Sequence, residues 1–69
     1  MENEMFTFVV CTSFSHVVET RYCLRSYADS YFDDLIRDTD DVQFVAYYAA
    51  SVGGLVNSWH LCPYLGLEG

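Results

Sequence analysis

The chain has 69 residues and a formal net charge of −7, from ten acidic residues and three arginines without any lysine. Hydrophobic residues make up 52% of it and aromatic residues 17%. This composition excludes a disordered chain, which lacks the apolar side chains needed for a core. The length predicts one domain over residues 1–69, ordered over about residues 5–65. The acidic balance makes nucleic-acid phosphates and anionic membranes poor partners, and a basic protein surface a good one.

The sequence predicts a cytoplasmic location. The start of the chain is acidic where a secretory signal is basic, and its apolar run, Phe6–Cys11, is short. No stretch approaches the roughly 20 apolar residues of a membrane-spanning helix. Three cysteines form an odd count without close pairs, which favours reduced thiols over a disulfide framework, although one bridge and one free thiol stay open.

The first half of the chain predicts two strands. Residues 5–12 are rich in β-branched and aromatic side chains, as is typical of a strand. Residues 17–25 alternate apolar and polar side chains, which favours a strand with one polar face. The alternative is a long helix that begins here and continues to Arg37. We prefer the strand because a better helix start follows it.

That helix is predicted over Tyr27–Asp38. Ser26 is the expected N-cap, and Asp29, at the third helical position, is the expected acid of a capping box. Apolar side chains then recur every three or four residues and predict one stripe that packs on a sheet. Its members are Ala28, Tyr31, Phe32, Leu35 and Ile36.

The last part of the chain predicts a hairpin. Residues 42–51 are a strand candidate. Gly53-Gly54 is expected to form a two-residue turn, since both positions can take a positive φ. Residues 55–62 are the return strand, and Pro63 ends it or marks an edge. The members of the return strand expected to share one face are Leu55, Asn57, Trp59 and Leu61.

The predicted fold class is α+β: a four-stranded, mostly antiparallel sheet with one amphipathic helix on one face, in the order β-β-α-β-β. One helix leaves the other face of the sheet open. We expect Tyr47 or Tyr48, together with Trp59, on that face, which is poor in polar residues for a solvated surface. The sequence therefore predicts a partner-binding or dimer face there, and a homodimer or hetero-complex in preference to a lone monomer.

Six of the ten acids lie within thirteen residues, opposed only by Arg37. Carboxylates near the C-terminus of a helix oppose the helix dipole, so helix stability does not explain the cluster. Three interpretations compete: a docking surface for a basic protein, in which carboxylates imitate phosphates; a hard-cation site, which lacks the glycine and terminal glutamate of an EF-hand loop; and a solvated face without a partner. The six residues are Asp29, Asp33, Asp34, Asp38, Asp40 and Asp41.

No cofactor, metal or catalytic residue is predicted. The cysteines and histidines lack the tight pairs of zinc sites, although residues two apart on a strand, such as His60 and Cys62, could share a metal with Cys11 or Cys23. No nucleophile-elbow, protease or P-loop motif is present, so we do not expect an enzyme.

The favoured hypothesis is a small acidic protein-binding module. It would inhibit or regulate a partner by occupying the basic surface that the partner keeps for nucleic acid, as a nucleic-acid mimic. Small acidic proteins that phages and mobile elements use against host nucleases or defence complexes share this size and charge, although no motif assigns the chain to a family. The alternative is a structural or assembly subunit that dimerises or docks through the open sheet face.

Overall fold

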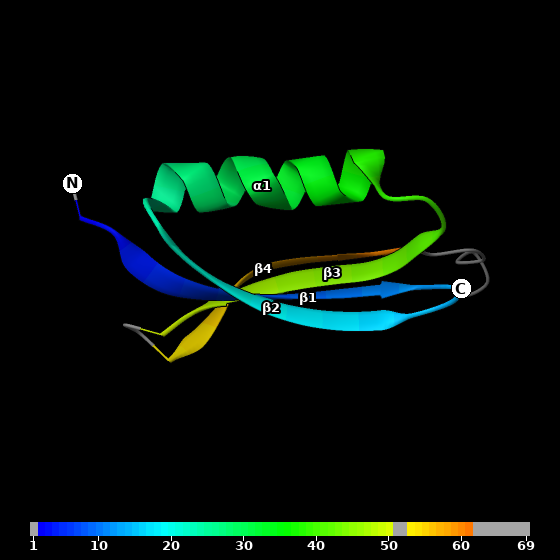
Figure 1. The fold of residues 1–69 in the computed structure, drawn as a ribbon, viewed down its shortest axis with the longest axis horizontal. Helices are drawn as coiled ribbons and strands as arrows, with labels where there is room; N and C mark the ends of the chain where they lie inside the picture. The colour runs from blue at the N-terminus through cyan, green and yellow to red at the C-terminus, as the bar shows by residue number, and fades with distance from the viewer. Residues whose placement is uncertain (1, 51–52, 62–69) are drawn as a thin grey trace, which may run out of the picture.

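The computed structural model describes residues 2–50 and 53–61, which form one antiparallel sheet and one helix (Figure 1). The sheet has the strand order β2-β1-β3-β4, and the helix α1 lies between β2 and β3 in the chain. The predicted α+β fold class is confirmed. The elements are β1 (Glu4–Thr12), β2 (His16–Cys23), α1 (Arg25–Asp38), β3 (Val42–Ala49) and β4 (Gly54–His60).

The two central strands, β1 and β3, carry the core. Phe8 of β1 lies opposite Glu19 of β2 and Tyr47 of β3 in the strand register. Side chains alternate between the two faces of a strand, so every second residue of these strands points at α1. The buried apolar cluster between helix and sheet consists of Phe6, Phe8, Val10, Ala28, Phe32, Val45, Tyr47 and Ala49.

The helix begins two residues earlier than predicted. Arg25 is its first residue, and Leu24, in an extended conformation, occupies the N-cap position without a side-chain cap. The predicted capping box of Ser26 and Asp29 is therefore wrong. Because β2 ends at Cys23, the chain passes from strand to helix without room for a separate capping turn. The alternation over residues 17–25 nevertheless identified a strand correctly.

The β3–β4 connection differs from the predicted two-residue turn. Gly54 already pairs with Ala49 in the ladder, and only Gly53 has a positive φ, of 65°. The register also shifts between Tyr47, which lies opposite Asn57, and Tyr48, which lies opposite Leu55. The extra residue places Leu55 on the opposite face from Asn57, so the predicted shared face of the return strand is wrong.

The end of the predicted return strand, at Cys62 and Pro63, lies outside the described residues. Within the described part of the chain, no helix has the length and apolar character needed to cross a bilayer.

Candidate functional site

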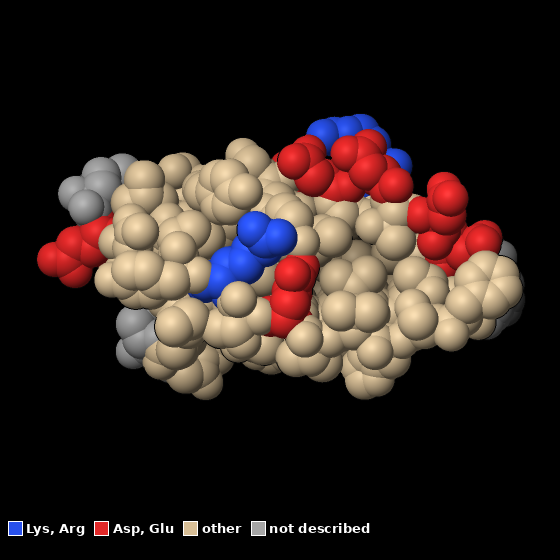
Figure 2. Space-filling model, viewed as in Figure 1, with Lys and Arg blue, Asp and Glu red and all other residues tan. Residues whose placement is uncertain are grey.

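One end of the molecule carries a concentration of carboxylates, which we call the acidic surface (Figure 2). It is formed by the second half of α1 and the turn that leads into β3. All five side chains belong to exposed residues, so none of these charges is taken up by the core. The acidic surface consists of Asp33, Asp34, Asp38, Asp40 and Asp41.

Arg37 is the one cation within the acidic surface. Its guanidinium lies 2.5 Å from the carboxylate of Asp34 and 3.9 Å from that of Asp38. Exposed pairs of this kind contribute about 0–1 kcal/mol to stability. One guanidinium against five carboxylates leaves this end of the molecule with a surplus of four negative charges.

The turn after α1 carries two of these carboxylates, and hydrogen bonds of its backbone fix its conformation. The helix ends at Asp38, and the backbone N–H of Thr39 donates to the carbonyl of Leu35 at 3.2 Å. Asp41 then adopts φ 56°, a left-handed conformation that Asp and Asn tolerate better than most residues. The N–H of Ser13 donates to the Asp41 carbonyl at 3.1 Å and ties this turn to the β1–β2 loop.

Asp29 does not belong with the other five aspartates. Its carboxylate accepts a hydrogen bond from the hydroxyl of Tyr47, a core residue that is 1% exposed. The geometry therefore gives Asp29 a structural role, because it satisfies a polar group that the sheet presents to the helix. The sequence grouped it with the other five by proximity alone.

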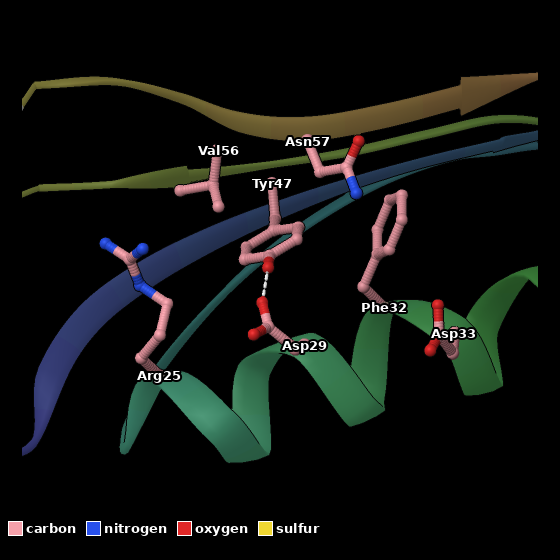
Figure 3. Close-up of a pocket in the computed structure, with 7 residues that line it drawn as sticks. All are labelled: Arg25, Asp29, Phe32, Asp33, Tyr47, Val56 and Asn57. Carbon is pink, nitrogen blue, oxygen red and sulfur yellow. Dashed lines mark hydrogen bonds between the residues drawn. The ribbon is translucent and has the colours of Figure 1, made fainter.

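A recess of about 320 Å³ lies between α1 and β4, next to this hydrogen bond (Figure 3). The rings of Phe32 and Tyr47 line one part of the recess, and positively and negatively charged side chains of α1 line the part next to the helix. The recess has room for a side chain of a partner. The residues that line it are Arg25, Asp29, Phe32, Asp33, Tyr47, Val56 and Asn57.

The face of the sheet opposite α1, which we call the open face, carries no charged side chain in the described residues. Several of its apolar residues are exposed, among them Tyr22 at 66% and Val18 at 58%. The strand register and the alternation of side chains define it. Its members are Met5, Thr7, Val9, Cys11, His16, Val18, Thr20, Tyr22, Phe44, Ala46, Tyr48, Leu55, Ser58 and His60.

Of the two tyrosines predicted as alternatives for this face, Tyr48 lies on it, while the placement of Trp59 there was wrong. Tyr47 points at the helix and is buried, and Trp59, opposite Val45 in the register, packs against the core on the same side. The sequence missed Tyr22 and Val18. The two residues belong to the same alternating set of β2. This pattern is visible in the sequence and could have placed both of them on one face once the open face was assigned.

The three arginines are all engaged with other side chains. Arg37 belongs to the acidic surface, and the Arg25 guanidinium lies 5.8 Å from the ring centre of Phe6. The Arg21 guanidinium lies 4.1 Å from the ring centre of Tyr31 and donates to its hydroxyl at 3.2 Å. They are spread over the molecule and form no basic groove of the kind that tracks a nucleic-acid backbone.

Tyr31 links the helix to β2. Its hydroxyl donates to the carboxylate of Glu19, which lies 3.7 Å from Arg21. Partial burial, together with the hydrogen bond to Glu19, raises the pKa of Tyr31, and the hydrogen bond to Tyr31 raises the pKa of Arg21. The raised pKa values favour a neutral Tyr31 phenol and a charged Arg21 guanidinium, and the hydrogen bonds among these side chains connect the helix to the sheet.

The cysteine and histidine residues are not gathered into a metal site within the described chain, where no group of three or more metal-binding side chains occurs. Cys11 and His16 are opposite each other in the register on the open face. Cys23 lies on the helix side, where burial raises the pKa of its thiol. Both Cys11 and Cys23 are free thiols.

Comparison of the chain with protein-family models, with curated proteins and with solved structures finds no match.

Proposed function

We propose that the chain is a protein-binding module whose acidic surface occupies a basic site on a partner protein, a site that the partner otherwise uses for nucleic acid. The observation that carries the proposal is the acidic surface itself: five exposed carboxylates at one end of the molecule, with only Arg37 among them. Such a field attracts a basic surface and speeds the encounter.

The spacing of the carboxylates also supports imitation of a phosphate backbone. Asp34 and Asp38 are four residues apart on α1, so they are neighbours on the helix surface at about 5–6 Å. Asp40 and Asp41 follow in the turn directly beyond the helix end. A row of anions at this spacing suits a surface in which lysine and arginine side chains are arranged for successive phosphates.

The direct test is capture from a nuclease-treated native lysate, with the immobilised protein as bait. We expect a nucleic-acid-handling protein that is retained at low salt, released at high salt and displaced by an added DNA or RNA duplex. A variant in which the five aspartates of the acidic surface are changed to asparagine should fold, since asparagine tolerates the left-handed φ of Asp41. It should not retain the partner.

A matched pair of variants separates position from total charge. D38N/D40N removes two charges from the acidic surface. E2Q/E4Q removes two at and just before the start of β1, at the far end of the molecule (Figure 1). The first should weaken capture markedly and the second only slightly. Equal capture by wild type and by the five-asparagine variant, both shown to be folded, refutes the proposal.

A further inference from the structure

The open face is the one broad surface of the described chain on which no Asp, Glu or Arg side chain projects, although the chain carries a net charge of −7. A solvated face of an antiparallel sheet is normally polar. Here, beside its threonine, serine and histidine side chains, it exposes Met5, Val18, Tyr22, Tyr48 and Leu55. Charge is thus segregated to the helix side and the ends.

From this segregation we infer that the open face binds a second copy of the same chain, so that two sheets stack face to face with the helices outside. A two-fold interface must be complementary to itself, since the same surface meets its copy. An uncharged face satisfies this condition, whereas the acidic surface, with charge of one sign, would repel its copy.

The electrostatics of the stack allow two copies of charge −7 to associate. Stacked sheets lie about 10 Å apart and a helix packs about 10 Å from its neighbour, so the two α1 helices would be about 30 Å apart. The Debye length at physiological ionic strength is about 8 Å. The carboxylates on the two α1 helices are therefore screened from each other in this arrangement.

The open face has the area of a small interface. Figure 1 shows the sheet from its edge, and its four strands have seven to nine residues. At about 3.3 Å per residue and about 4.8 Å between strands, the face measures about 30 by 19 Å, or roughly 500–600 Å². Specific interfaces take about 600–1,000 Å² from each partner, so a stack of two open faces lies at the small end of this range. A single helix on a four-stranded sheet also gives this chain a small core, for which dimerisation is a common remedy.

The strand β2 supplies a matched pair of test positions. Val17 and Val18 are adjacent and similarly exposed, at 48% and 58%, but Val18 lies opposite Val9 on the open face while Val17 lies opposite Val10 on the helix side. Val18→Glu would bring a carboxylate into the dimer interface, and Val17→Glu would place the same group outside it.

Sedimentation equilibrium on the full chain tests the inference. We expect wild type at about 50 μM to have twice the chain mass of 7.9 kDa. Val18→Glu should raise the dissociation constant at least about ten-fold, and Val17→Glu less than about two-fold. Circular dichroism confirms folding, and Tyr22→Glu, at a more exposed position of the same face, replaces Val18→Glu if that variant unfolds.

A wild-type protein that sediments as a monomer at about 500 μM, in low and high salt, overturns the inference. So does equal dissociation by the Val17 and Val18 variants, or a dimer that survives both open-face substitutions, because either result places the contact elsewhere. The outcome is independent of the proposed function, since none of these substitutions touches the acidic surface.

Discussion

Tyr47 and Tyr48 are adjacent in β3, yet their hydroxyl groups have different environments. The Tyr47 hydroxyl donates to Asp29 from within the core, whereas Tyr48 is on the open face. Tyr47→Phe keeps the buried ring and removes only the donor, so we expect it to lower the free energy of unfolding by about 1 kcal/mol. Tyr48→Phe should change it by less than about 0.5 kcal/mol. Urea denaturation of the two variants measures this difference, and equal losses would contradict it.

Tyr31 makes stability depend on alkaline pH. Its pKa is raised in the folded protein, chiefly by burial, above the ordinary value of about 10. The unfolded chain therefore releases this proton at a lower pH than the folded protein does. The resulting contribution to stability is fully present below about pH 10 and is lost as the pH rises toward the folded-state pKa.

Replacing the phenol should remove this dependence. We expect Tyr31→Phe to show a smaller loss of stability than its parent between about pH 9 and 11, measured by urea midpoints. A Cys23→Ala background is needed, because burial raises the pKa of that thiol as well and its window begins near pH 8.5. Tyr22→Phe serves as the control on the open face. Identical pH profiles for Tyr31→Phe and its parent would exclude this role.

At the scale of the elements, the turn between α1 and β3 depends on one backbone conformation. Asp41 has φ 56°, a left-handed conformation that costs most residues about 1–2 kcal/mol; glycine adopts it without steric cost, and Asp and Asn tolerate it because their short polar side chains can hydrogen-bond locally. Asp41→Ala should therefore lose about 1 kcal/mol of stability, while Asp41→Asn should be nearly neutral and Asp41→Gly neutral or stabilising. Asp40→Ala is the control, and chemical denaturation is the measurement. Similar losses at both positions would argue against strain at Asp41.

The elements themselves were largely predictable, because period-two and period-3.6 patterns report directly on strands and helices. Their ends were not. Leu24, and not the predicted Ser26, occupies the N-cap position, since the short strand-to-helix connection, not a cap, sets the start of α1. Gly54 was assigned to the turn because a glycine pair is a strong turn signal, whereas ladder pairing with Ala49 determines its place.

The sequence shows that β3 is a strand more clearly than it shows which face of this strand meets the helix. Both alternating sets of this strand are apolar, Val45, Tyr47 and Ala49 on one side and Phe44, Ala46 and Tyr48 on the other. Hydrophobicity cannot tell which set meets the helix, so the sequence left Tyr47 and Tyr48 as alternatives for the open face. The five aspartates of the acidic surface were easier to find, because charge density is read from the sequence without knowledge of the register.

At the scale of the whole molecule, charge and apolar surface are separated: carboxylates gather at one end of the helix layer, and the open face has no charge among its described residues. Two proposed contacts follow from this separation, and they differ in physical origin. Attraction between the acidic surface and a basic partner is electrostatic and screened by salt. Packing of two open faces is hydrophobic, and the only electrostatic effect on it is repulsion between two acidic chains.

Salt should therefore change the two interactions in opposite directions. Between about 0.1 and 1 M sodium chloride the Debye length falls from about 10 to 3 Å. Affinity for the captured partner should fall at least about ten-fold, while the dimer dissociation constant should stay constant or decrease, because screening reduces the repulsion between the copies. Biolayer interferometry on the captured partner and sedimentation of the free protein give the two measurements on the same preparation. Parallel weakening of both by salt would mean that charge-led contacts hold the dimer as well, and the open face would then be the wrong surface for self-association.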